Sequence, residues 1–183
     1  MTVNGVAYSI VRLLGKGKGG YSWLAERNGG RCVLKQIHHE PCDYYQFADK
    51  LATELNDYRR LTAADIPVPK LIDWDAREER IVKAYIPGPT IFDLVRDGDM
   101  RREYVGLVHA LSEKARAAGL NLDWFPTNFI PRDGALWYVD YECNAYMERW
   151  SFETWGVKYW SRTPEFEAHL EKQKTGTRSL KGT

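Results

Sequence analysis

The spacing of apolar residues changes along this chain, and the change limits the fold more than any other feature of the sequence. Val6, Tyr8 and Ile10 are apolar residues at alternate positions of Val6–Leu14, and two short segments, Ser22–Glu26 and Arg31–Ile37, follow. Such alternation predicts strands, and Asn28-Gly29-Gly30 is a turn sequence suited to positive φ angles between paired strands. Over Tyr44–Leu61 apolar residues instead recur at three- and four-residue steps, which predicts an amphipathic helix. The chain therefore opens with an antiparallel meander followed by a helix.

The sequence Pro87-Gly88-Pro89 divides the rest of the chain and favours a boundary between two parts. The elements predicted around it are strands over 70–74 and 80–85, helices over 91–95 and 103–118, a strand over 136–139 and a helix from Pro164. We therefore expect an α+β chain in which residues 1–85 are strands with one helix and residues 86–171 are mainly helical. Residues 172–183 are basic and lack apolar periodicity, so we expect a flexible tail there.

The composition is that of an ordinary globular protein, and its balanced charge excludes some function classes. The 183 residues include 26 Lys+Arg and 25 Asp+Glu, a formal net charge of +1. A protein that mainly neutralises nucleic-acid phosphates would carry a basic excess, so we expect no nucleic-acid partner. No segment has the ~18–20 uninterrupted apolar residues that span a bilayer, so we expect no membrane partner. The sequence does not predict an oligomeric state.

Cysteine usage predicts a cytoplasmic protein. Cys32, Cys42 and Cys143 are odd in number and form no Cys-x-x-Cys pair, which favours reduced thiols over a disulfide scaffold. The N-terminal residues have neither the basic start nor the apolar run of a signal peptide. His38 and His39 have no cysteine partner at zinc-finger spacing, so we do not expect zinc.

The glycine cluster over Gly15–Gly20 contains Gly-x-Gly-x-x-Gly, whose physical use is the close approach of backbone N–H groups to phosphates. A dinucleotide-binding fold needs these glycines to begin a helix, whereas a kinase-type loop needs them to join two antiparallel strands. Tyr21–Ala25 continues as a strand, which favours the second context. An ordinary glycine-rich hairpin is the alternative interpretation.

The residues on either side match the kinase context. Leu14–Ala25 resembles the glycine loop of the protein-kinase superfamily, and Cys32-Val33-Leu34-Lys35 resembles the strand whose lysine holds the α- and β-phosphates of ATP. In that family a glutamate on the next helix pairs with this lysine. Glu54 lies beside the apolar stripe of the predicted helix, so the resemblance implies that Lys35 and Glu54 form a catalytic ion pair. A solvated glutamate on the helix surface is the alternative.

The segment Ile81–Gly88 resembles the hinge strand that presents backbone groups to adenine in the same family. The resemblance implies backbone donors at Ala84 and Ile86, with Lys83 at the gatekeeper position. The nucleotide-binding residues that it implies are Gly15, Gly17, Gly20, Lys35, Ala84 and Ile86.

The most specific match follows the second long helix. Asp123-Trp124-Phe125-Pro126-Thr127-Asn128 reproduces the family's Asp-x-x-x-x-Asn, and Asp140 ends a short strand twelve residues after Asn128. The resemblance implies that Asp123 is the base that accepts the proton of the substrate hydroxyl, while Asn128 and Asp140 hold Mg²⁺ against the phosphates. Six matches in the family's order between residues 14 and 142 argue against coincidence.

Departures from the protein-kinase pattern bear on the acceptor. Asn121-Leu122 stands where His-Arg is typical, and Phe125 replaces the lysine common in serine/threonine kinases. Asp140-Tyr141-Glu142 is more similar to the Asp-Phe/Tyr-Glu of choline- and aminoglycoside-type kinases. The 43 residues after Asp140 are too few for the usual helical substrate-binding half. These departures favour a small-molecule acceptor over a protein.

The resemblance thus implies a two-lobed protein-kinase-like fold with a shortened C-terminal lobe, and ATP- and Mg²⁺-dependent transfer of the γ-phosphoryl group to an unidentified hydroxyl. The alternative function is a nucleotide-binding pseudokinase that serves as an interaction module, and a structural scaffold is a third interpretation. Trp150, Trp155 and Trp160 recur every five residues. Such an aromatic run suits base stacking or a sugar platform, but we expect it to pack in the core.

Overall fold

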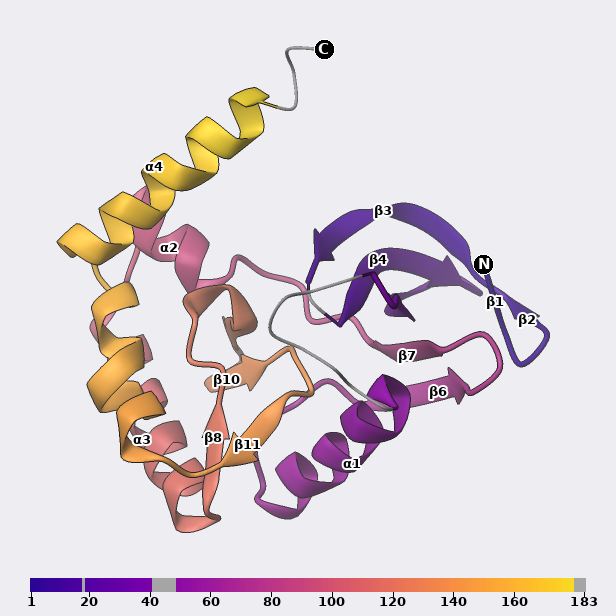
Figure 1. The fold of residues 1–183 in the computed structure, drawn as a ribbon, viewed down its shortest axis with the longest axis horizontal. Coiled ribbons are helices and arrows are strands. Elements are labelled where there is room, and N and C mark those ends of the chain that lie inside the picture. Colours follow the sequence, from indigo (N-terminus) through magenta and orange to yellow (C-terminus); the bar gives the residue numbers. More distant parts are fainter. Residues whose placement is uncertain (18, 41–48, 180–183) are drawn as a thin grey trace.

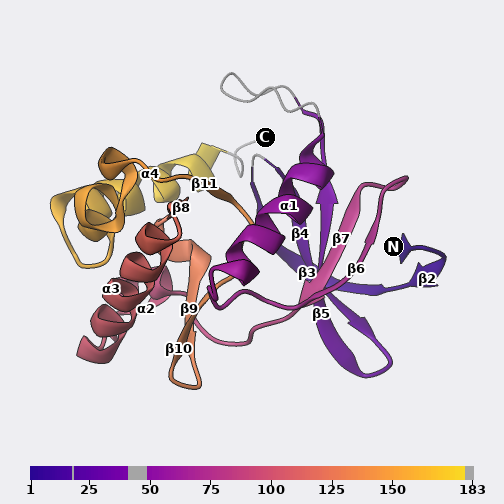
Figure 2. The same ribbon diagram turned by 90° about the horizontal axis from the view of Figure 1, so that it is seen from below.

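The computed structural model describes residues 1–17, 19–40 and 49–179. These residues form an α+β fold, as the sequence predicted, built on a five-stranded antiparallel sheet and on helices (Figure 1). Seen from below, helix α1 (Lys50–Ala63) lies between this sheet and helix α3 (Arg102–Ala117) (Figure 2). None of the described helices is long and apolar enough to cross a membrane.

The five strands of the main sheet are ordered β3-β4-β5-β7-β6, and every neighbouring pair is antiparallel. They are β3 (Ser9–Lys16), β4 (Gly20–Arg27), β5 (Gly30–Ile37), β6 (Leu71–Asp75) and β7 (Arg80–Ala84). The turn between β4 and β5 takes φ angles of 50° at Asn28 and 75° at Gly29, and a two-residue hairpin turn requires such positive values. The predicted meander is therefore confirmed.

The N-terminal segment differs from the prediction of one strand over Val6–Leu14. It is interrupted after Ala7, so that β2 (Val6–Ala7) pairs with β1 (Thr2–Val3) and β3 begins at Ser9. Asn4 and Gly5 form the turn of this small hairpin, with φ angles of 49° and 77°. An Asn-Gly pair at this position is a strong hairpin signal that explains the interruption.

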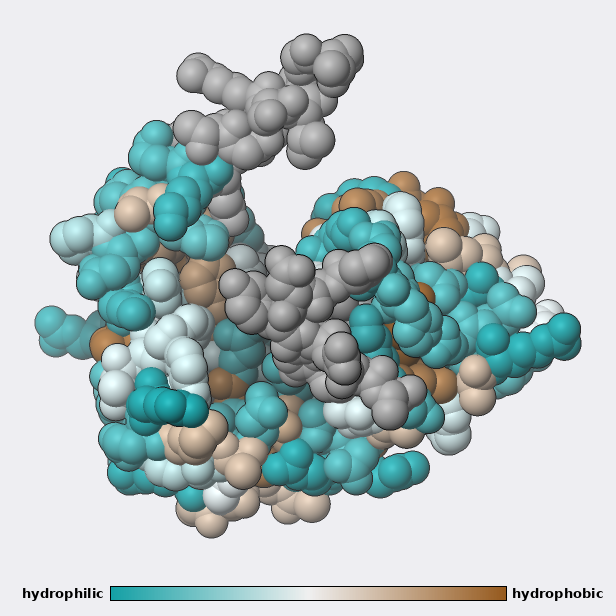
Figure 3. All heavy atoms as spheres, in the orientation of Figure 1, coloured by the Kyte–Doolittle hydropathy of each residue, from teal (hydrophilic) through white to brown (hydrophobic). Residues whose placement is uncertain are grey.

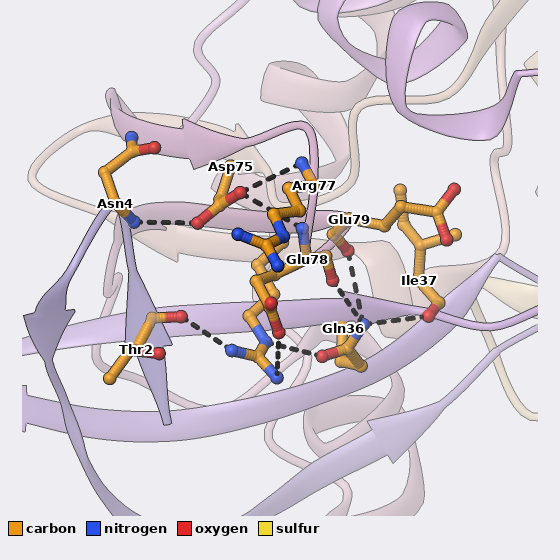
Figure 4. A network of polar contacts seen from close by, with 9 residues as sticks. Thr2, Asn4, Gln36, Ile37, Asp75, Arg77, Glu78 and Glu79 are labelled. Atoms are coloured by element: carbon orange, nitrogen blue, oxygen red, sulfur yellow. Dashed lines mark hydrogen bonds and ion pairs between the residues drawn. The ribbon is translucent and has the colours of Figure 1, made fainter.

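A network of polar contacts fastens the small hairpin to the main sheet (Figure 4). The Arg80 guanidinium donates to the Thr2 carbonyl at 2.7 Å and to Gln36 Oε1 at 2.6 Å. The backbone N–H of Asn4 donates to Asp75 Oδ2 at 2.8 Å. These contacts join the first residues of the chain to three strands of the sheet.

Helix α1 begins later than predicted. The sequence predicted a start at Tyr44, but Asp49 is extended and its carboxylate accepts the Ala52 N–H at 2.8 Å, so the helix begins at Lys50. This carboxylate cap satisfies a backbone N–H group that has no partner within the helix. Residues 41–48, which include the earlier part of the predicted helix, lie outside the described residues.

The strand β3 is an edge of the sheet with exposed side chains along its whole length. Figure 3 shows hydrophobic residues at the surface over this strand. They are Ile10, Val11, Leu13 and Leu14. The buried residues of the sheet are instead on β4, β5 and β7.

The residues after 86 contain more strand than the sequence predicted. The helices are α2 (Ile91–Asp97), α3 and α4 (Pro164–Ser179), and the strands are β8 (Leu120–Leu122), β9 (Phe129–Arg132), β10 (Ala135–Tyr138) and β11 (Cys143–Ala145). Strand β8 pairs with β11, and β9 pairs with β10. Of these, the sequence predicted only β10, which follows the Asp133-Gly134 turn. Helical residues still outnumber strand residues here, as predicted, and β8, β9 and β11 are additions to the expected elements.

Helix α4 corrects the expected tail. The sequence predicted that residues 172–179 are flexible, but the helix that starts at Pro164 continues to Ser179. Phe166 and Leu170 are buried in the core and fix its first turns.

The core of this region is aromatic. Phe152 and Trp160 are buried, as core packing predicted, but Trp150 is 46% exposed, so the expectation is wrong for that residue. Cys32 and Cys143 are buried free thiols. The third cysteine, Cys42, lies outside the described residues.

Candidate active site

One cavity of about 1070 Å³ brings together all the residues that the sequence marked as functional. Its walls come from β3, β4 and β5, from α1, from the end of β7, and from the loop segments on either side of β9 and β10. The predicted residues that line it are Gly15, Gly17, Gly20, Lys35, Glu54, Ala84, Ile86, Asp123, Asn128 and Asp140. These residues are separated by up to 125 positions in the sequence, and the fold alone makes them neighbours.

The glycine turn between β3 and β4 has two kinds of glycine. A Cβ on Gly20 would overlap the Gln36 carbonyl oxygen, so packing against β5 requires glycine there. A Cβ on Gly15 or Gly17 would meet no atom of the described residues within 4 Å, so packing does not explain these two. Gly19, which the sequence pattern did not single out, would place a Cβ 3.3 Å from Lys35 Nζ. The backbone of the turn therefore lies close to the Lys35 amine at Gly19.

Lys35 lies at the centre of the charged groups of the cavity. Its amine contacts Glu54 Oε1 on α1 and lies 3.7 Å from Asp140 Oδ1. The side chains of Lys35 and Glu54 are only 10% and 13% exposed. Lys35 projects toward α1 because it is opposite Ile81 in the sheet, whose side chain packs against Leu51 and the rest of that helix.

The ionisation of the cavity follows from these contacts. Burial by itself would lower the pKa of Lys35, but the charges of Asp140 and Glu54 outweigh burial and raise this pKa above its ordinary value. Burial would likewise raise the pKa of Asp140, and the nearby amines of Lys35 and Lys83 lower it instead. Burial lowers the pKa of Lys83, with the charge of Asp140 acting in the opposite direction. Lys35 and Asp140 are thus held in their charged forms.

The hinge prediction needs one correction. Ala84 and Ile86 line the cavity at and after the end of β7. However, the Ala84 N–H donates to the Lys70 carbonyl at 2.9 Å, because β6 runs beside β7. Ala84 is therefore not the free backbone donor that the sequence predicted. Ile86, which lies beyond the strand, keeps its predicted place.

The segment 123–128 forms a tight loop with internal hydrogen bonds. The Phe125 N–H donates to Asp123 Oδ1 at 3.1 Å, which orients the carboxylate. The Asn128 side-chain amide donates to the Asp123 carbonyl at 3.2 Å. Because the amide nitrogen of Asn128 is used in this way, its Oδ1 is the atom that it presents to a ligand.

Tyr138, which the sequence did not mark as functional, joins this loop to the segment after Asp140. Its buried hydroxyl accepts the Asp123 N–H at 3.2 Å and donates to the Glu142 carbonyl at 2.7 Å. Burial raises the pKa of Tyr138 well above its ordinary value, so the hydroxyl keeps its proton. A buried tyrosine needs hydrogen-bond partners, but its sequence position does not reveal which ones.

The tryptophan-rich segment, residues 150–160, packs against the loop that carries Asp123. Trp124 is buried and its ring stacks on Phe129 at a centroid distance of 5.7 Å. The Trp160 indole N–H donates to the Trp124 carbonyl at 2.8 Å. A Cβ on Gly156 would lie 2.6 Å from Trp124 Cβ, so this position requires glycine. The aromatic core thus fixes the loop that carries Asp123.

A second group that the sequence did not mark fixes α1. The buried carboxylate of Asp57 accepts the Cys143 N–H at 3.2 Å and an Arg60 N–H at 2.9 Å. Arg60 also donates to the Cys143 carbonyl at 3.1 Å. Asp57 lies one turn after Glu54, so these bonds hold the helix that carries Glu54 against β11, just beyond Asp140.

The donor set fits magnesium bound together with phosphates. Asp140 offers a carboxylate and Asn128 an amide oxygen, both hard ligands of the kind that Mg²⁺ prefers. The part of the chain that the structure describes contains no group of three or more His, Cys, Asp or Glu side chains placed to hold a metal alone. Mg²⁺ usually uses only one or two carboxylates and completes its coordination with substrate phosphates and water.

Comparison of the chain with protein-family models and with curated proteins finds no match. The interpretation of the cavity therefore depends on its residues and their geometry.

Proposed function

We propose that this protein is an ATP- and Mg²⁺-dependent phosphotransferase with a compact protein-kinase-like arrangement of two lobes, residues 1–85 and 86–171. It transfers the γ-phosphoryl group of ATP to a hydroxyl, and the acceptor is a small molecule rather than a protein. The observation that carries the proposal is the convergence of Lys35, Glu54 and Asp140 on one cavity that also contains Asp123 and Asn128. Phosphoryl transfer requires this set of charges for positioning and charge stabilisation.

Each residue has a chemical task in this proposal. The amine of Lys35, kept charged by Glu54 and Asp140, neutralises phosphate oxygens under the glycine turn. The carboxylate of Asp123, oriented by the Phe125 N–H, accepts the proton of the acceptor hydroxyl. Asn128 and Asp140 would hold Mg²⁺, which supplies charge compensation for the phosphates when bound.

The size of the cavity supports a small acceptor. Its volume of about 1070 Å³ lies just above the ~300–1,000 Å³ typical of ligand pockets, which leaves space beside a nucleotide. That space extends along β11, where Asn144 and Ala145 line the cavity. An acceptor hydroxyl can then meet Asp123 inside the cavity.

Turnover with labelled ATP tests the proposal. We would screen hydroxyl-bearing metabolites for transfer of the labelled γ-phosphoryl group and then compare wild type with Asp123→Asn. The variant should bind nucleotide as wild type does but lose about 10²–10⁴-fold in turnover, the usual contribution of a positioned acid or base. Unchanged turnover would remove Asp123 from the mechanism. Nucleotide binding that needs no metal, with no transfer to any acceptor, would support the pseudokinase instead.

A further inference from the structure

We infer that Lys83 is a positioning residue that fixes the two proposed magnesium ligands, Asn128 and Asp140, relative to each other. This inference rests on the proposed function and deepens its metal site. Lys83 is on β7, its side chain lines the cavity, and it is only 5% exposed.

The sheet register explains why Lys83 reaches this site. On β5 and β7, Lys35 lies opposite Ile81 and Val33 lies opposite Lys83. Because side chains alternate between faces, the two lysines project from the same face as diagonal neighbours. Two adjacent ammonium groups repel each other, and the carboxylate of Asp140 near both of them offsets this repulsion.

The contacts of Lys83 surround Asp140 in the sequence. Its amine donates to the Val139 carbonyl at 2.6 Å, immediately before Asp140. The same amine lies 4.5 Å from the centre of the Tyr141 ring, immediately after Asp140. Tyr141 is fully buried, with its hydroxyl bonded to the Pro69 carbonyl, so this anchor does not move freely. The backbone on both sides of Asp140 is thus held by one side chain from β7.

Val139 links Asn128 to Lys83 and Asp140. The Val139 N–H donates to the Asn128 carbonyl at 2.9 Å, while the Val139 carbonyl accepts from Lys83. One residue therefore joins Asn128, Lys83 and Asp140. A hydrophobic side chain in place of Lys83 would fill the space but leave the Val139 carbonyl without this donor. Groups that orient metal ligands in this way typically contribute 10–100-fold to metal affinity.

The test is the Mg²⁺ dependence of ADP binding. Titration calorimetry measures the ADP affinity at each of a series of Mg²⁺ concentrations. Lys83→Met should raise the Mg²⁺ concentration at half-maximal effect by about 10–100-fold. ADP affinity in chelator should stay at the wild-type value, because Asp140 acts on the nucleotide through the metal. Lys83→Arg keeps a charged donor and should recover most of the lost Mg²⁺ affinity.

Lys50→Met is the matched control. Lys50 is also a buried lysine of this cavity, 8% exposed, and its amine donates to the His38 carbonyl at 2.6 Å, in a segment that carries neither proposed magnesium ligand. Its removal should leave the Mg²⁺ midpoint unchanged. An unchanged midpoint in Lys83→Met, or equal shifts in Lys83→Met and Lys50→Met, would overturn the inference. If Lys83→Met does not fold, Lys83→Gln carries the test, since its amide is one bond shorter and carries no charge, so a loss of Mg²⁺ affinity is again expected.

The outcomes separate the inference from the proposed function. Wild-type ADP binding that is independent of Mg²⁺ would overturn the proposed metal site and the inference together. Mg²⁺-dependent binding in wild type with an unchanged Lys83→Met would overturn the inference alone.

Discussion

Replacing Asp57 with alanine should destabilise the protein more than removing one partner of an exposed ion pair. The buried Asp57 carboxylate accepts the Cys143 N–H and pairs with Arg60. Without it the buried N–H has no acceptor, which costs about 1–3 kcal/mol. Losing the pair with Arg60, whose side chain is 37% exposed, adds up to about 1 kcal/mol, so we expect about 1–4 kcal/mol in total. At roughly 2–4 °C per kcal/mol for a chain of this size, the melting midpoint should fall by about 2–16 °C.

Thermal and urea unfolding of three proteins measure this loss. Asp57→Asn keeps an oxygen that can accept the Cys143 N–H, so it should lose less than Asp57→Ala. Asp65→Ala is the control, because Asp65 pairs with Lys114 at 2.6 Å but its side chain is 93% exposed. Surface pairs of this kind contribute little to stability. Equal midpoints for Asp57→Ala and Asp65→Ala would refute the reasoning and would remove Asp57 as the group that fixes α1.

Three further predictions test separate parts of the cavity. Gly20→Ala should lower the free energy of unfolding by about 1–3 kcal/mol, because its Cβ would collide with the Gln36 carbonyl, whereas Gly17→Ala should unfold like wild type; urea titration of both would contradict this if they lose the same amount. Glu54→Gln should fold normally but reduce turnover about 10²-fold once an acceptor is known, because the neutral amide holds the Lys35 amine less strongly and the amine shifts toward Asp140; wild-type turnover would exclude the ion pair from catalysis. Burial raises the pKa of the Cys143 thiol from 9.0 to about 12, so the unfolded thiol loses its proton first and stability should fall as the pH rises from about 9 to 12. Unfolding measured over that pH range in a Cys42→Ser background should show a weaker fall for Cys143→Ala, and identical pH profiles would contradict the assignment.

Much of the architecture could be predicted because its elements are long enough to show a period. The strands β4 and β5 are eight residues long and flank a clear turn sequence, and α3 presents Val108, Leu111 and Ala115 at helical spacing before Gly119. Gly119 has a φ angle of 68°, the left-handed conformation that favours glycine after a helix. The short strands β8 and β11 could not be predicted, because three residues pair only when the fold brings them together.

The candidate site divides in the same way. Lys35, Asp123, Asn128 and Asp140 match the spacing of the family that the sequence resembles, so the sequence pattern marks them as candidates, and all four line the cavity. The residues that hold them follow no such spacing. Tyr138 acts through a hydroxyl between two backbone groups, and nothing in its sequence position distinguishes it from a core tyrosine. Asp57 is missed for the same reason, and the sequence placed Lys83 at the gatekeeper position without revealing its bond to Val139, because these backbone partners are 56 or more residues away.

The hinge shows a different limit. The spacing placed Ala84 correctly at the cavity, but the state of its N–H depends on the neighbouring strand β6. Pairing between strands is a property of the whole sheet. A local pattern therefore predicts which residue lines a site, but it does not predict which of its backbone groups are already used.

The stabilisation of the folded protein by ATP, with Mg²⁺ or with chelator, tests the central claim most directly and needs no acceptor. At 100 times the dissociation constant a ligand adds about 2.7 kcal/mol to the free energy of unfolding. The melting midpoint should then rise by about 5–10 °C with Mg²⁺ and ATP, and by less when chelator replaces Mg²⁺. Asp140→Asn should remove most of the Mg²⁺-dependent part and keep the remainder. If no nucleotide shifts the midpoint of the wild-type protein, with or without Mg²⁺, the cavity does not bind ATP and the proposed phosphotransferase is wrong.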